Sequence, residues 1–136
     1  MSRRFLSIMI AAGILAVGTA FAQQHRLYNE IMKDVGATFA SLKKNLDSNS
    51  AAAAAADAAK LEGLFTETEA FWAPLDTQDA VKFAKGARDA ASAVGTAAKS
   101  NDMKAAQASY SAIQKNCGNC HFAHREDTGK GYLIRP

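Results

Sequence analysis

The sequence predicts an all-α fold, an antiparallel up-down-up-down bundle of four helices. Alanine is abundant and strand-forming residues are sparse, which is a helical composition. The two prolines, Pro74 and Pro136, leave long stretches of chain uninterrupted, and apolar residues recur there in steps of three and four. Short connections between four such segments favour antiparallel neighbours.

The first 22 residues are expected to be removed from the mature protein. Arg3 and Arg4 precede an apolar run over residues 5–17, and residues 20–22 (Ala-Phe-Ala) form a small-x-small cleavage site. This pattern is typical of a secretory signal peptide. The alternative, a membrane anchor, is disfavoured because the apolar run is shorter than the roughly 20 residues that a spanning helix needs. We therefore expect one domain over residues 23–136, exported to the periplasm.

Export changes the charge of the working protein. Removing Arg3 and Arg4 from the 16 basic residues leaves 14, against 13 acidic residues, so the net charge is near +1. We find no basic stripe interleaved with aromatic residues, so nucleic acid is not an expected partner. Export also places the thiols outside the reducing cytosol, where they tend to be oxidised or otherwise occupied.

The first two helices are expected over residues 23–46 and 50–73. The buried stripe of the first helix is Leu27, Ile31, Val35, Phe39, Leu42 and Leu46. Residues 47–50 (DSNS) break this helix and offer N-caps for the next one. Six alanines open the second helix, whose apolar face continues through Leu61, Leu64, Phe65, Thr68, Phe71 and Trp72. Pro74 ends it.

The third helix is expected to begin after Thr77 as N-cap, and the fourth is expected over residues 102–126, with Ser100 or Asn101 as its cap. Small residues form the inner face of the third helix, which lets a neighbour approach closely. The buried stripe of the fourth helix is Met103, Ala106, Tyr110, Ile113, Cys117, Cys120 and His124. Gly129 and Gly131 exclude helix from the tail, whose residues 132–134 are expected to fold back onto the bundle.

The only two cysteines stand three residues apart and a histidine follows the second one directly. Cys117-Gly118-Asn119-Cys120-His121 is the C-x-x-C-H motif of c-type haem attachment. Each cysteine forms a thioether with a haem vinyl group, and the spacing matches the two vinyls when the segment is helical. His121 is then the proximal ligand of the iron. The sequence predicts one covalently bound haem c near the C-terminal end of the last helix.

Other uses of two cysteines fit the pattern less well. A thioredoxin-like dithiol follows a strand, whereas this pair lies about 16 residues into a predicted helix. A disulfide would close a tiny loop and stabilise little. A zinc site would need two further ligands at defined spacing, and only His25 and His124 remain.

The signal peptide, the four-helix bundle and a single C-x-x-C-H motif near the end of the last helix together resemble the class II c-type cytochromes. These are cytochrome c′ and its low-spin relatives of the cytochrome c-556 type. The resemblance covers essentially the whole mature chain, although only the haem motif is specific. It implies a monohaem electron carrier with redox partner proteins in the periplasm, and a possible homodimer formed through the first two helices.

Met32 is the candidate for a second iron ligand. His121 lies roughly 7–8 Å before the expected end of the fourth helix, and Met32 lies roughly 13 Å into the first helix. In an antiparallel bundle these depths are similar, so Met32 would reach the haem face opposite His121. The resemblance places Met32 at the ligand position of the c-556 type. The alternative is a core methionine that fills a gap beside Ile31.

The sequence departs from the family pattern four residues before Met32. An arginine is usual there, and this chain has Tyr28, with Arg26 two residues earlier. Arg125, four residues after His121, matches a position where the family commonly has a basic residue near the haem. The alternative for Arg125 is a surface arginine at a helix C-terminus, where cations are favoured.

The remaining candidates have weaker assignments. Tyr28, Gly36 and Phe39 share the helix face of Met32, and Gly36 leaves room for a porphyrin. Trp72 and Tyr110 are expected in the core, and Met103 belongs to the other end of the bundle. His124 is expected to contact a haem propionate or to be solvated. His25 would ligate iron only in a bis-histidine site.

The function expected is single-electron transfer through a low-spin haem held by His121 and Met32, with no enzymatic step, since the sequence shows no general base, nucleophile or oxyanion arrangement. One alternative is a five-coordinate cytochrome c′ that binds nitric oxide or carbon monoxide, with Met32 as a steric lid. The other is a helical thiol-redox protein without haem.

Overall fold

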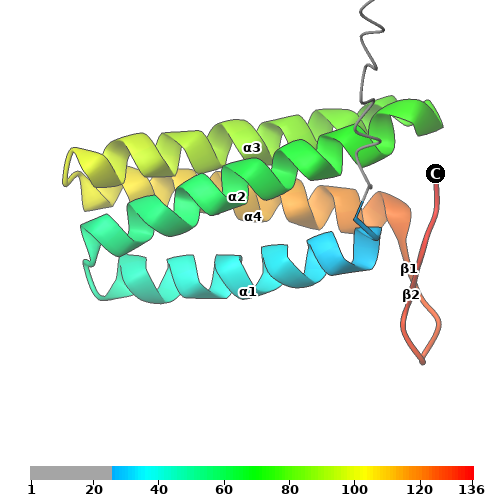
Figure 1. Cartoon of the computed structure of the whole chain (residues 1–136), viewed down its shortest axis with the longest axis horizontal. Helices are drawn as coiled ribbons and strands as arrows, with labels where there is room; N and C mark the ends of the chain where they lie inside the picture. The colour runs from blue at the N-terminus through cyan, green and yellow to red at the C-terminus, as the bar shows by residue number, and fades with distance from the viewer. Residues whose placement is uncertain (1–25) are drawn as a thin grey trace, which may run out of the picture.

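The structure is a computed structural model that describes residues 26–136. It is a helical bundle, as predicted, of four long helices: α1 (Tyr28–Asp47), α2 (Ala51–Trp72), α3 (Gln78–Lys99) and α4 (Met103–His124) (Figure 1). A 3-10 turn, η1 (Ala73–Leu75), follows α2, and strands β1 (Arg125–Asp127) and β2 (Tyr132–Ile134) end the chain. The expected signal peptide and His25 lie outside the described residues. Within residues 26–136, no helix is long and apolar enough to cross a membrane.

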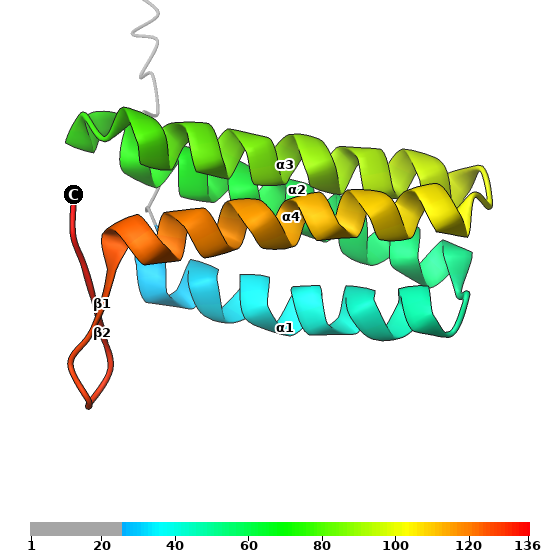
Figure 2. The same ribbon diagram turned by 180° about the vertical axis from the view of Figure 1, so that it is seen from behind.

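The connections between helices are tight because each contains one residue in the left-handed conformation. These residues are Asn49, Asp76 and Asn101, with φ of 53°, 55° and 59°. Asn and Asp tolerate this conformation better than other non-glycine residues. In both views the α1–α2 and α3–α4 turns lie at one end of the bundle, while the start of α1 and the end of α4 lie at the other (Figures 1 and 2).

The helix caps differ in part from those predicted. Ser50 and Thr77 occupy the N-cap positions of α2 and α3, but neither side chain makes a capping hydrogen bond in the described structure. The hydroxyl of Thr77 instead donates to the carbonyl of Leu75 at 3.1 Å. The cap of α4 is Asp102, whose carboxylate accepts from the amide of Ala105 at 3.0 Å. The expectation of Ser100 or Asn101 at this cap was wrong.

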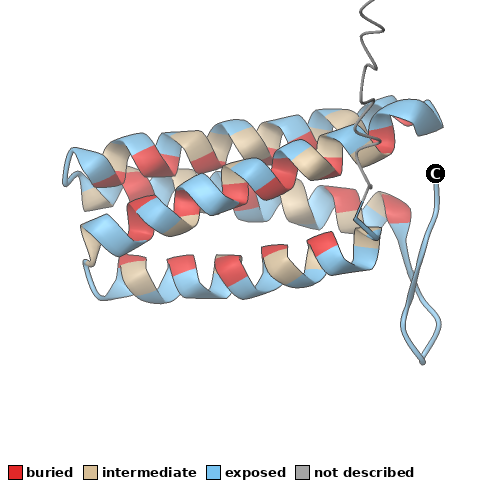
Figure 3. Ribbon diagram, viewed as in Figure 1, coloured by how far each residue is buried: buried red, intermediate tan, exposed pale blue. Residues whose placement is uncertain are grey.

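The core is densest around α3 and thins out toward α1. Helix α3 packs extensively on both α2 and α4, and its buried face is almost entirely alanine, which permits close approach. Helix α1 packs mainly on α2 and touches α4 little. The buried residues form one inward-facing row on each helix (Figure 3). The bundle is therefore open between its first and last helices.

Most of the predicted stripe of α1 is buried, with two exceptions. Ile31, Val35, Leu42 and Leu46 are buried, as predicted. Leu27 is 66% exposed because it stands at the N-cap, before the first turn. Phe39 is half-buried and stacks on Tyr110 of α4, with ring centroids 4.4 Å apart. This aromatic pair bridges the opening between α1 and α4.

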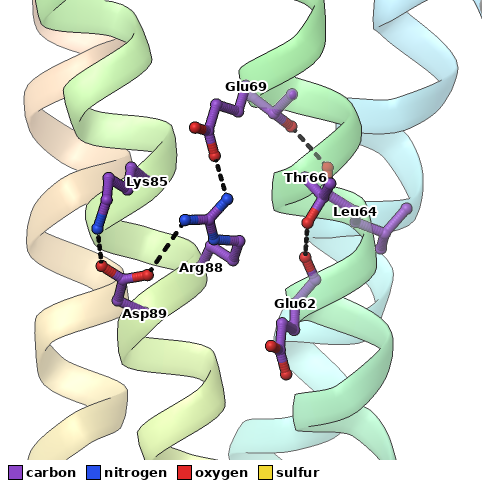
Figure 4. Close-up of polar contacts among 8 residues, drawn as sticks. Glu62, Leu64, Thr66, Glu69, Lys85, Arg88 and Asp89 are labelled. Carbon is purple, nitrogen blue, oxygen red and sulfur yellow. Dashed lines mark hydrogen bonds and ion pairs between the residues drawn. The ribbon is translucent and has the colours of Figure 1, made fainter.

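A polar network ties α2 to α3. The guanidinium of Arg88 on α3 donates a hydrogen bond to the carboxylate of Glu69 on α2 and also pairs with Asp89 (Figure 4). Asp89 forms a second ion pair with Lys85 on the same helix. The side chains of Arg88 and Glu69 are 28% and 26% exposed, so water screens this pair less than the others on the surface. The network links α2 and α3, the two helices with the most extensive mutual packing.

The end of α4 differs from the prediction. The helix ends at His124 and not at residue 126, because Arg125 adopts an extended conformation and starts β1. Strand β1 pairs antiparallel with β2 in the register Arg125 with Ile134 and Asp127 with Tyr132. Gly129 (φ 73°) lies in the turn between them, where a side chain would be strained. The tail is thus a β-hairpin, which we call the C-terminal hairpin (residues 125–134).

Candidate functional site

A cavity of about 600 Å³ lies where α1 and α4 diverge. Its lining comes from the start of α1, the end of α4, α2, α3 and the C-terminal hairpin. The volume falls within the roughly 300–1,000 Å³ that is typical of cofactor and ligand sites. The cavity contains the whole predicted set of site residues: Tyr28, Met32, Cys117, Cys120, His121 and Arg125.

The two thiols lie on the α4 wall of the cavity. Cys117 is half-buried, Cys120 is buried, and both are free. Burial, joined by the charge of Cys120, raises the pKa of Cys117 to about 11. Burial, joined by the charge of Asp79, raises the pKa of Cys120 to about 11. Redox-active dithiols have depressed pKa values, because the thiolate is the nucleophile, so this environment disfavours the thiol-redox alternative.

His121 meets the requirements of a metal ligand. Its ring is half-buried on the cavity wall, and burial, followed by the charge of Arg125, lowers its pKa below 6.5. The imidazole is therefore neutral at pH 7, the form that coordinates metals. Within residues 26–136, neither ring nitrogen hydrogen-bonds to another residue. A nitrogen lone pair is thus available toward the cavity.

Met32 lies on the α1 wall of the same cavity. It is half-buried and packs against the main core. The structure therefore brings Met32 and His121 together from helices that are far apart in sequence. Gly36 lines the cavity one turn further along α1, and a Cβ atom there would meet nothing within 4 Å. Ligation of iron by Met32 stays a prediction.

Tyr28, at the position where the suggested resemblance implies an arginine, belongs to an aromatic cluster at the start of α1. Its hydroxyl accepts a hydrogen bond from the indole N–H of Trp72 at 3.0 Å, and its ring stacks on Phe71 at 4.2 Å. Burial raises the pKa of Tyr28 to about 12, so the phenol is neutral at physiological pH. Trp72 is in the core, as predicted, and its 1% exposed ring also lines the cavity. The residue in the arginine position therefore supplies an apolar wall.

Basic side chains reach the cavity from two elements. Arg125 is exposed and places its guanidinium over the ring of Tyr132, 4.3 Å from the centroid. Lys33, which the sequence analysis did not single out, also lines the cavity. The only feature of the sequence that could have pointed to Lys33 was its position directly after the candidate ligand Met32. Arg26 instead pairs with Asp34 and Glu67 and does not line the cavity, so it does not take the place of the arginine that the resemblance implies at position 28.

His124 is neither solvated nor free. It is 8% exposed, and its two ring nitrogens contact the carbonyl of Arg135 at 2.7 Å and a carboxylate oxygen of Asp79 at 3.0 Å. The solvated placement was wrong, and both nitrogens already have partners from the protein. The reason is that the chain turns back after the hairpin, which places Arg135 beside His124 at the end of α4.

Further lining residues escaped the sequence analysis. Asn116 precedes the haem motif, and its amide donates to the carbonyl of Ala112 at 2.9 Å. Tyr132, Leu133 and Ile134 line the cavity from β2. Tyr110 does not reach it; it stacks behind Phe39 and lines a separate cavity of about 260 Å³. The stacked pair thus forms the floor between the two cavities.

The arrangement fits a covalently bound haem. Two thiols and a neutral imidazole lie on one wall, a thioether on the other, and the remaining walls are mostly apolar with cations at Lys33 and Arg125. Among residues 26–136, no group of three or more His, Cys, Asp or Glu side chains is placed to hold a metal ion. Comparison with protein-family models, with curated proteins and with solved structures found no match for this chain.

Proposed function

We propose that this protein is a periplasmic, monohaem c-type cytochrome of the class II kind that carries single electrons between redox partner proteins. The observation that carries the proposal is the one cavity that holds the C-x-x-C-H residues on α4 and Met32 on α1. The placement of the helix ends supports an up-down-up-down bundle. The sequence pattern of residues 1–22, which is typical of a signal peptide, supports export, and a homodimer through α1 and α2 is part of the proposal.

The bound haem would supply an iron that gains and loses one electron. Cys117 and Cys120 would anchor the porphyrin, and His121 would ligate the iron through its neutral imidazole. Met32 would complete a low-spin site, since its thioether faces the same cavity from α1. A methionine ligand raises the reduction potential relative to a second histidine.

The other residues of the cavity would bind and shield the cofactor. The apolar walls lower the local dielectric constant, which tunes the potential of the iron. Lys33 and Arg125 are placed to pair with the propionates, because both are cations at the cavity edge. We assign no bond-making chemistry to the protein.

The test is co-expression with haem-maturation machinery, followed by mass spectrometry and absorption spectroscopy. A mass increase of one haem and a low-spin spectrum are expected. Met32→Ala should convert the spectrum to high-spin and lower the reduction potential. The matched control is Met103→Ala, a half-buried methionine packed against the same core outside the cavity lining, which should leave the spectrum unchanged.

Two outcomes would contradict parts of the proposal. A high-spin spectrum in the wild-type protein would indicate the five-coordinate alternative, in which the cavity on the Met32 side admits nitric oxide or carbon monoxide. A wild-type chain that acquires no haem under these conditions would remove the cytochrome assignment altogether.

A further inference from the structure

The C-terminal hairpin carries apolar side chains that the protein itself does not bury. Tyr132, Leu133 and Ile134 are 62%, 58% and 39% exposed, although all three line the large cavity. Exposed apolar residues grouped around a cavity indicate a surface that a ligand covers. A porphyrin in the cavity would bury them, so the hairpin is suited to be a wall of the haem site.

The hairpin stands at the open end of the bundle. It leaves the end of α4 at a steep angle, on the side where α1 begins (Figures 1 and 2). Because α1 and α4 touch little, this end is where water would otherwise enter. The hairpin therefore closes the side of the cavity that the four helices leave open.

One residue, His124, attaches the returning strand to the helices. Its carbonyl accepts from the amide of Arg135 at 2.8 Å, and its Nδ1 contacts the carbonyl of Arg135 at 2.7 Å. Within residues 26–136, every hydrogen bond between segment 132–136 and the helices involves Arg135. The third of these bonds runs from the guanidinium of Arg135 to the carbonyl of Ala123, at 3.4 Å. In the described part of the chain, the one hydrogen bond that a helix side chain makes to this returning segment thus comes from the imidazole of His124, while the bond to the main-chain carbonyl of residue 124 does not depend on the side chain.

The helices hold His124 itself in place. Its Nε2 contacts Asp79 on the first turn of α3 at 3.0 Å, and its ring lies 5.1 Å from the ring of Trp72. With 8% of its surface exposed, the imidazole has little freedom to turn. It connects the start of α3, the end of α4 and the tail of the chain.

We propose that His124 is a positioning residue that holds the C-terminal hairpin as the closing wall of the haem cavity, where the hairpin keeps water and water-soluble oxidants from the haem. This inference rests on the proposed function. Removing the wall would expose the haem to a higher dielectric constant, which stabilises the more highly charged oxidised form and lowers the reduction potential.

The test compares His124→Ala with the wild-type holoprotein and with Glu126→Gln as control. Glu126 lies on β1 and is exposed, and it does not line the cavity. The first measurement is hydrogen exchange at the amide of Arg135. It should quicken about tenfold in His124→Ala, the factor that corresponds to the roughly 1.4 kcal/mol expected for lost hydrogen bonds.

The second measurement is oxidation of the reduced holoprotein by ferricyanide and by a cationic cobalt(III) trisphenanthroline complex. Each oxidant takes one electron from the haem iron and is reduced to its ferrous or cobaltous form. Both rates should rise in His124→Ala and stay at wild-type values in Glu126→Gln. Using oxidants of both charges separates loss of shielding from a change in the electrostatic attraction of the oxidant to the protein.

Leu133→Ser is the second variant, for the case that His124→Ala does not fold by circular dichroism. It alters the hairpin wall and leaves the anchor intact, so oxidation should quicken without faster exchange at Arg135. If the variants bind haem but keep the wild-type rates of hydrogen exchange and oxidation, the role of His124 is wrong while the proposed function stands. A wild-type chain without haem would overturn the proposed function and the shielding role together.

Discussion

At the scale of single residues, the site combines groups that sequence patterns show with groups that only the tertiary structure brings together. Asp79 illustrates the second kind. It stands in the first turn of α3, 45 positions from His124, whose Nε2 it contacts. An acidic residue is also favourable at this helix end because it faces the positive end of the helix dipole.

The environment of Asp79 predicts a pH dependence of stability. Partial burial acts to raise its pKa, but the hydrogen bond and charge of His124 and the amide of Ala80 together hold it below 3.8. The folded state therefore binds this proton less readily than the unfolded state. Its contribution to stability is present above about pH 3.8 and is lost as the pH falls through the lower folded pKa.

Urea unfolding of wild-type protein and Asp79→Asn across pH 2–7 tests this linkage. We expect Asp79→Asn to be less stable at neutral pH, with a difference that closes at acid pH. Glu62→Gln, on α2 and away from His124, is the control and should show no such trend. A difference that persists unchanged to the lowest pH would contradict the assigned pair.

The difference between local sequence motifs and contacts made only by the tertiary structure explains which site residues the sequence could predict. Cys117, Cys120 and His121 form a local motif, because the proposed haem attachment would need them at fixed spacing on one helix. Met32 could be placed by its depth along α1. Lys33 was indicated only by its position next to Met32. Helical periodicity placed His124 on the buried face of α4, but it could not show its bonds to Asp79 and Arg135, which depend on how the rest of the chain folds around it.

At the scale of elements, helical periodicity and turn residues predicted four helices whose ends lie within about two residues of those observed, except that the first helix begins at Tyr28 and not at residue 23. The C-terminal hairpin was missed. Its strands have three residues each, too few to show an alternating pattern, and its glycines indicate a turn without indicating what pairs across it. Local patterns thus define long elements better than short ones.

The contact between α3 and α4 beside the haem motif gives a prediction about two glycines. A Cβ on Gly86 would lie 2.5 Å from the Oδ1 of Asn116, whereas a Cβ on Gly63 would meet nothing within 4 Å. Gly63→Ala should stabilise α2 by about 0.5–1 kcal/mol through helix propensity. Gly86→Ala gains the same propensity, but it must displace Asn116 and its bond to Ala112, which costs about 1 kcal/mol.

Thermal or urea unfolding should therefore show a clear gain for Gly63→Ala and little net change for Gly86→Ala. Because Asn116 lines the cavity, Gly86→Ala should also shift the absorption spectrum of the holoprotein, and Gly63→Ala should not. Equal stabilisation by both substitutions would show that Asn116 moves aside without cost.

At the scale of the whole molecule, α2 and α3 each pack on two neighbours, whereas α4 packs mainly on α3, and α1 packs mainly and less extensively on α2. Periodicity predicted which face of each helix is buried, but it carries no information on distances between helices. The opening between α1 and α4 therefore could not be predicted from the apolar faces of the helices. A bound haem would supply packing on the side of α1 that lacks a protein neighbour, since the cavity borders Met32, Val35 and Phe39.

This asymmetry predicts that α1 is the least protected helix of the chain without haem. Local stability follows the number of buried contacts, so amides in α1 should exchange faster than those of α2 and α3 in a Cys117→Ser, Cys120→Ser variant. Haem attachment should slow exchange in α1 by about tenfold or more while changing α3 little, because α3 already packs on both neighbours. Hydrogen exchange with mass spectrometry on the two proteins makes the comparison, with peptides from α3 as the internal control. Uniform slowing over all four helices would mean that the haem stabilises the bundle globally, and equal protection of α1 in both proteins would mean that α1 does not border the haem.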